Sequence, residues 1–70
     1  MPRFIVKVYK MYRGRIEIDT HKYDTFEEMT RAVNVFKCFR YVYYIEAGEL
    51  IYVDTDNVYY KEWIKWIRKK

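Results

Sequence analysis

His21 is the only histidine of the 70-residue chain and the residue best suited to acid–base chemistry. It lies between Asp19 and Asp24, where we expect a connection between a strand and a helix. With Lys22 or Tyr23 beside it, His21 could act as the general base of a small ribonuclease. Acid–base catalysis also needs a second positioned group and a cleft, which so short a chain rarely builds. We therefore interpret His21 as a solvated loop residue and expect no enzymatic activity.

Asp54, Asp56 and Asn57 bring oxygen atoms close together, as calcium sites do. An EF-hand loop also requires a central glycine and a bidentate glutamate, and neither follows in the required place. These residue types are favoured at helix N-caps, which is the interpretation we adopt. With two glycines the chain has no phosphate-binding loop, and its one cysteine, Cys38, can form neither a thiolate cluster nor an intramolecular disulfide. The sequence therefore predicts no metal, no cofactor and no catalytic residue.

Binding is the chemistry that the composition favours. Nine tyrosines, four phenylalanines and two tryptophans are interspersed with Lys and Arg, above all in the two terminal segments. Tyrosine offers a stiff apolar ring with a hydroxyl at its rim, and Lys and Arg add charge and cation–π contacts, so such surfaces suit macromolecular partners. The predicted binding surface consists of Arg3, Lys7, Tyr9, Arg13, Tyr41, Tyr43, Tyr44, Tyr59, Lys61, Lys65, Trp66 and Lys69.

The formal net charge of +4 conceals a segregation along the chain. Five basic residues and no acid occur up to Arg15, and five more occur from Lys61 to Lys70 against Glu62 alone. Residues 16–60 hold nine acids against four Lys or Arg. If the two ends meet in space, they form a basic patch that attracts acidic partners.

The first third of the chain predicts a hairpin. Residues 4–12 alternate and are rich in β-formers, with Phe4, Val6 and Val8 on the expected core face. A turn at Arg13 and Gly14 leads into a strand over 15–19, in which we expect Ile16 and Ile18 to point inward.

A helix should follow the first hairpin. Thr25 and Glu28 have the spacing of a capping box, which predicts that the helix begins at Phe26. Its apolar stripe follows the three-and-four spacing of a buried helix face. The stripe consists of Phe26, Met29, Ala32, Val33, Phe36 and Phe39.

The second half predicts another hairpin and another helix. Residues 40–46 and 50–54 read as strands joined by a turn at Ala47 and Gly48. The polar residues 54–57 then cap a final helix whose apolar stripe is Tyr60, Trp63, Ile64 and Ile67. On such a helix Lys61, Lys65, Arg68 and Lys69 would form a basic face away from the stripe.

Residues 1–70 therefore predict a single small α+β domain of order ββαββα, an antiparallel sheet with helices packed on one face. A chain of this length buries only about 60% of its unfolded surface, so its core must be dense or shared with a second copy. We expect the large rings to fill that core, namely Phe4, Phe26, Phe36, Phe39, Tyr60 and Trp63.

The resulting functional hypothesis is a small non-catalytic binding protein with a protein partner, of the accessory or inhibitor type that viruses and mobile elements encode. A homodimer is a further expectation. The alternative is a DNA- or RNA-binding protein that uses the basic first strand and last helix, with an affinity that falls steeply with salt. The single cysteine and an N-terminal apolar run interrupted by Lys7 and Lys10 favour a cytoplasmic protein without a membrane partner.

Overall fold

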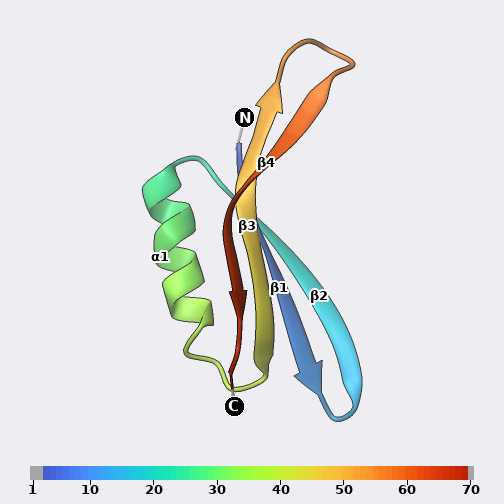
Figure 1. The fold of residues 1–70 in the computed structure, drawn as a ribbon, viewed down its shortest axis with the longest axis vertical. Helices are drawn as coiled ribbons and strands as arrows, with labels where there is room; N and C mark the ends of the chain where they lie inside the picture. Colours follow the sequence, from blue (N-terminus) through green and yellow to red (C-terminus); the bar gives the residue numbers. More distant parts are fainter. Residues whose placement is uncertain (1–2, 70) are drawn as a thin grey trace.

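The computed structural model describes residues 3–69 and contains one four-stranded antiparallel sheet with a helix on one face (Figure 1). The elements are β1 (Phe4–Tyr12), β2 (Arg15–Tyr23), α1 (Phe26–Phe36), β3 (Val42–Tyr52) and β4 (Val58–Ile67). The strand order in the sheet is β2-β1-β3-β4. The predicted order ββαββα is therefore wrong: the order over the described residues is ββαββ, and α1 alone covers the sheet.

The predicted final helix is β4, an edge strand paired with β3. Most of its residues are β-branched or aromatic, which suits a pleated surface better than a helix. The register with β3 shifts between Ala47 and Gly48, so that Trp63 is an extra residue in β4. This bulge interrupts the alternation of β4 and leaves an apolar spacing that imitates a helix. The supposed helical stripe is thus divided, because Ile64 lies on the α1 side of the sheet and Ile67 on the other.

The predicted turn at Ala47 and Gly48 is also wrong, because β3 runs straight through both residues. The turn lies at residues 53–57, where the Val53 N–H donates to the carbonyl of Asn57 at 3.0 Å. Gly48 instead allows the ring of Tyr60 and the main chain of β4 to approach β3 closely. A Cβ at this position would lie 2.7 Å from the ring of Tyr60 and would also collide with a main-chain carbonyl of β4.

The β1–β2 hairpin turns at Arg13 and Gly14, as predicted, and both residues have positive φ, 51° and 76°. This two-residue turn fixes the register, so that Ile16 pairs with Met11 and Ile18 pairs with Tyr9. Directly paired residues share a face, and this face points away from α1. The prediction that Ile16 and Ile18 point inward is therefore wrong, and their exposed fractions are 60% and 56%.

Helix α1 begins at Phe26, as the capping box predicts. The Thr25 hydroxyl accepts from the Glu28 N–H and donates to the Glu28 carboxylate, both at 3.1 Å. The helix ends at Phe36, so Phe39 follows it. Its buried residues are Met29 and Val33.

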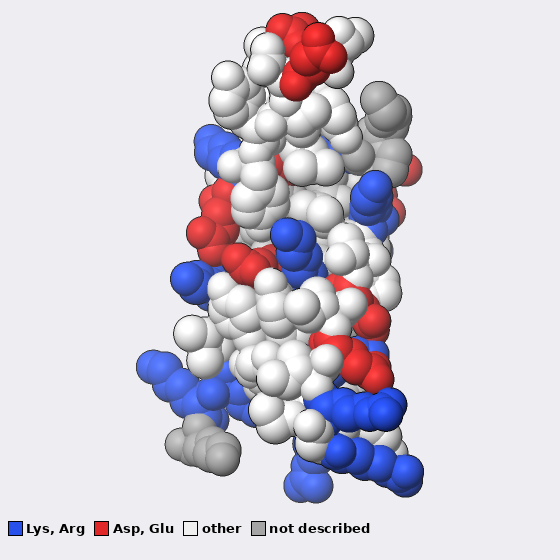
Figure 2. Space-filling model, turned by 90° about the vertical axis from the view of Figure 1, so that its right-hand side faces the viewer, with Lys and Arg blue, Asp and Glu red and all other residues white. Residues whose placement is uncertain are grey.

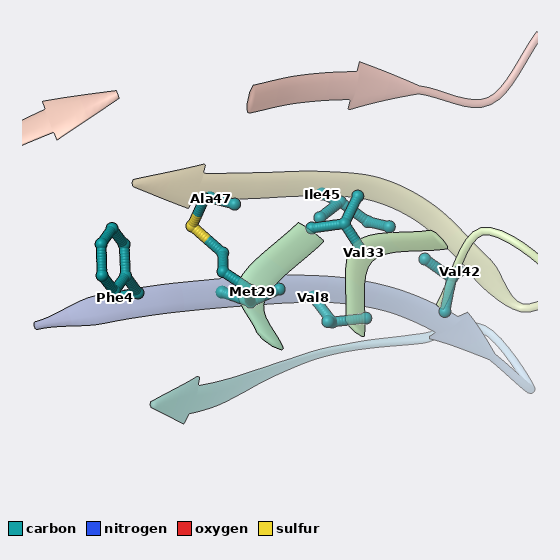
Figure 3. Close-up of a cluster of buried hydrophobic side chains, with 8 residues drawn as sticks. Phe4, Val8, Met29, Val33, Val42, Ile45 and Ala47 are labelled. Carbon is teal, nitrogen blue, oxygen red and sulfur yellow. The ribbon is translucent and has the colours of Figure 1, made fainter. Parts of the chain in front are cut away.

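The core lies between α1 and the centre of the sheet (Figure 3). It consists of Phe4, Val6, Val8, Met29, Val33, Val42, Ile45 and Ala47. Four of the rings expected in the core, Phe26, Phe39, Tyr60 and Trp63, are instead 38–45% exposed. Phe26 and Trp63 contact each other edge to face with centroids 5.6 Å apart, whereas Tyr60 lies on the side of the sheet that α1 does not cover.

Arg68 fastens the end of β4 to the connection between α1 and β3. Its guanidinium donates three hydrogen bonds to main-chain carbonyls: to Val42 and Lys37 at 2.8 Å and to Phe39 at 2.6 Å. Its own N–H donates to the carbonyl of Tyr43 at 2.9 Å. The irregular segment between α1 and β3 is therefore held by the last strand of the sheet.

Candidate functional site

One face of the sheet is covered by α1, and the other, here called the open face, is covered by no element of residues 3–69. The pairing register orders the open face into rows that cross the strands β2, β1, β3 and β4. Three complete rows are Lys22-Ile5-Gly48-Glu62, Thr20-Lys7-Glu46-Lys65 and Ile18-Tyr9-Tyr44-Ile67. Figure 2 views the molecule from the side opposite α1 and shows uncharged surface along its length, interrupted by side chains of both charges.

Glu46 lies at the centre of the open face among three tyrosines. The Tyr9 hydroxyl donates to its carboxylate at 3.0 Å, and this bond raises the pKa of Tyr9 above its usual value. Desolvation, followed by the negative charge of Glu46, raises the pKa of Tyr44 and of Tyr60 in the same direction. All three tyrosines are therefore neutral hydrogen-bonding groups at neutral pH.

The rings of the open face are packed against one another and against lysines. The centroids of Tyr9 and Tyr44 are 4.8 Å apart. The ammonium of Lys7 lies 5.7 Å from the ring of Tyr60, and that of Lys65 lies 6.0 Å from the ring of Tyr44. Such contacts hold the long side chains over apolar surface and reduce the entropy that a partner would have to remove.

Aliphatic side chains occupy the end of the open face near the β1–β2 turn. Met11, Ile16, Ile18 and Ile67 are each more than half exposed. Isolated exposed aliphatics are ordinary, but neighbouring ones on a sheet face form a continuous apolar patch, which is typical of an interaction surface. The sequence predicted that Met11 faces outward, but it assigned Ile16, Ile18 and Ile67 to the core. The two-residue turn at Arg13 and Gly14 was the signal that could have located Ile16 and Ile18, because it sets the register.

The predicted binding surface is divided between the two sides of the sheet. Lys7, Tyr9, Tyr44 and Lys65 lie together on the open face, and the ring of Tyr43 is 6.4 Å from that of Tyr9. The residues on the α1 side are Tyr41, Tyr59, Lys61 and Trp66; Arg3, Arg13 and Lys69 are exposed at or beyond strand ends. The expected basic face made of Lys61, Lys65 and Lys69 does not exist, because the bulge at Trp63 shifts the alternation of β4 and places Lys61 and Lys65 on opposite sides of the sheet.

Charge is also segregated along the length of the molecule. The β1–β2 turn, the connection from α1 to β3 and the end of β4 meet at one end, here called the basic end (Figures 1 and 2). It carries Arg13, Arg15, Lys37, Arg40, Arg68 and Lys69. Lys70 lies outside the described residues. Asp54 and Asp56 occupy the β3–β4 turn at the opposite end.

Aromatic rings accompany the charges of the basic end. Phe39 is stacked on Tyr41 with centroids 5.6 Å apart and planes at 14°, and Tyr12 meets Tyr41 edge to face. Lys10, Tyr12, Glu17 and Tyr41 line an open depression of about 330 Å³. Its lysine is paired with Glu17 at 3.9 Å and with Asp19, so the depression itself is close to neutral.

The residues first considered for catalysis and metal binding have structural contacts. The ring of His21 is half-buried and stacks on Phe36 with centroids 5.0 Å apart, and alternation points Lys22 to the other side of the sheet.

The Asp54 carboxylate accepts from the Asn57 side chain and from the N–H groups of Asp56 and Asn57, and these bonds lower the pKa of Asp54. Asp54 thus caps a turn between strands rather than a helix. Among residues 3–69, no three His, Cys, Asp or Glu side chains are grouped as a metal ion would require.

Comparisons with known proteins give no match: no family model fits the chain, and neither the curated proteins nor the solved structures contain a significant relative. Over the described part of the chain, no helix combines the length and the apolar composition that crossing a membrane requires. The open face and the basic end are the two candidate binding surfaces of the described residues.

Proposed function

We propose that this chain is a non-catalytic binding domain that recognises a protein through its open face. The observation that carries the proposal is the composition of that face. Exposed aliphatics, packed tyrosines and charges of both signs lie side by side on a rigid sheet, as in protein–protein interfaces. A nucleic-acid surface would instead carry mainly positive charge.

The expected energetic centre of the interface is the group of tyrosines around Glu46. Tyrosine loses little conformational entropy on binding and combines apolar area with a hydroxyl, so it is enriched among the residues that dominate binding energy. Tyr9 and Tyr44 are already ordered by their mutual contact and by Glu46. The exposed aliphatics Ile18 and Ile67 flank this pair in the same row and would exclude water from it.

The test is affinity capture from the native cell with three baits. The first is the wild-type chain, the second carries Ile18→Ser and Ile67→Ser on the open face, and the third carries Val35→Ser and Val53→Ser elsewhere. All four positions are more than half exposed, so the substitutions have little effect on folding. A protein retained from nuclease-treated lysate by the first and third baits, but lost by the second, supports the proposal. Identical captures by all three baits would exclude the open face.

The basic end supports a second candidate function, the binding of a single-stranded nucleic acid. Its six described Lys and Arg residues lie beside the exposed rings of Tyr12 and Tyr41, and stacking on rings within a basic groove is how many proteins hold single strands. Affinity for labelled RNA should then fall steeply with salt and drop further when Arg13 and Arg15 are changed to Glu. Absence of RNA and DNA binding at low salt would refute this candidate.

A further inference from the structure

We infer that the protein seated on the open face is a second copy of this chain, in a symmetric dimer whose two-fold axis runs along the strands between β1 and β3. This inference depends on the proposed function, since it takes the open face to be a protein-binding surface. It goes further in naming the occupant. The row order of the open face and the placement of its charges favour this occupant.

Rotation about such an axis reverses the order of the residues in each row. Each row of one copy then lies on the same row of the second copy, in the opposite order. In the row Thr20-Lys7-Glu46-Lys65, the axis passes between Lys7 and Glu46. Lys7 of one copy then faces Glu46 of the other, and the same contact is repeated on the opposite side of the axis. Two-fold interfaces require this self-complementarity of one patch.

The neighbouring rows match under the same rotation. The row with Ile5 and Gly48 places Lys22 at one edge and Glu62 at the other, so each lysine meets a glutamate of the second copy. Ile5 and Gly48 contribute little to this contact, because Ile5 is only 8% exposed and the ring of Tyr60 occupies the space over Gly48. The third row places Tyr9 on Tyr44 and Ile18 on Ile67. Lys7, Lys22 and the third row thus meet residues of complementary charge or similar polarity, whereas Lys65 meets the hydroxyl of Thr20.

The other axis within the plane of the face gives a poor match. An axis perpendicular to the strands, through the row of Lys7 and Glu46, lays Lys7 on Lys7 and Glu46 on Glu46. Like charges brought together in an interface are strongly unfavourable. The charge pattern therefore favours the axis that runs along the strands over a perpendicular axis through this row.

The area of the face corresponds to a weak dimer. The rows from Lys22 to Ile16 extend about 20 Å along the strands, and four strands are about 19 Å wide, so each face covers roughly 400 Å². Two faces bury about 800 Å², which is less than a stable interface usually buries and corresponds to a weak, transient one. A dissociation constant in the micromolar range is therefore expected.

The decisive experiment uses Lys22 and Glu62, which lie on opposite edges of the sheet and face each other only between copies. Sedimentation equilibrium of the wild type should give a mass approaching twice 8.9 kDa as concentration rises. Lys22→Glu alone or Glu62→Lys alone places two like-charge pairs in the dimer, and each should weaken it by about tenfold. An equimolar mixture of the two variants should restore dimerisation, because both cross-contacts are then of opposite charge.

The matched controls are Glu27→Lys and Arg31→Glu on the exposed side of α1, which should leave the association unchanged. A wild-type chain that stays monomeric at millimolar concentration, or a mixture that associates no better than its components, would overturn the inference. An edge-to-edge dimer through β4 would be insensitive to Lys22→Glu and would also overturn it. A monomer that still captures another protein in an Ile18- and Ile67-dependent way would refute the dimer and leave the proposed function standing.

Discussion

Ile45 and Ile18 have the same side chain and lie in one sheet, yet their environments differ completely. Ile45 is on the face covered by α1 and has no exposed surface, whereas Ile18 is on the open face and is 56% exposed. Both faces carry large apolar residues, and only one has a helix to cover them. In this chain, therefore, the apolar character of a residue does not determine whether it is buried. A residue is buried only where α1 or a neighbouring strand reaches it.

The strongest test of this comparison replaces each isoleucine by alanine. Ile45→Ala removes fully buried methyl groups and leaves a cavity, so it should lower the free energy of unfolding by about 2–5 kcal/mol. Ile18→Ala should change it by less than about 0.5 kcal/mol in dilute solution. Urea denaturation followed by tryptophan fluorescence measures both variants. Equal losses would show that the open face is buried within the monomer after all.

A smaller loss of stability is expected from substitution of Arg68, which lies at the basic end and holds the connection between α1 and β3. Arg68→Ala deletes three charge-assisted hydrogen bonds to main-chain carbonyls and should cost about 1.5–3 kcal/mol of stability. Arg68→Lys should recover only part of the loss, because an ammonium cannot reproduce the planar fork. Hydrogen exchange should accelerate at the Val42 N–H, beside the connection that Arg68 holds. Unchanged exchange there would contradict the assigned role.

The smallest expected effect on stability comes from the ionisation of the tyrosines on the open face. The pKa of Tyr9 is raised in the folded state, first by its hydrogen bond to Glu46. The folded chain therefore holds this proton more tightly than the unfolded chain. The associated stability is complete below the unfolded pKa of about 10 and is lost as pH rises through the higher folded value. Absorbance at high pH should show late tyrosine ionisation in the wild type and an earlier one in Glu46→Gln. Superimposable titration curves would contradict the role of Glu46.

The first hairpin and α1 could be predicted because their signals are local. A turn with Gly14 and a capping box at Thr25 each act over a few residues, and both form as expected. The structure of the second half of the chain depends on a non-local contact, the pairing of β4 with β3. Its bulge at Trp63 gives β4 an apolar spacing that suits a helix, and Gly48 resembled a turn residue although it makes room for Tyr60.

The candidate site was predicted only in part, because its composition follows from residue types but its placement depends on non-local packing. Lys7, Tyr9 and Tyr44 were identified by residue type, and they do lie together on one face. Ile18 and Ile67 were assigned to the core because alternation and periodicity indicate which residues share a face, but not which face a helix will cover. That choice depends on where α1 packs.

The separation of charge between the basic end and the β3–β4 turn has a further consequence. The Cα trace is 41 Å long, with cationic side chains at one end and Asp54 and Asp56 at the other, so the molecule carries an electric dipole along its strands. A dimer with its axis in that direction adds the two dipoles instead of cancelling them. In the field of a polyanion such a particle would rotate before contact and arrive with its basic end first.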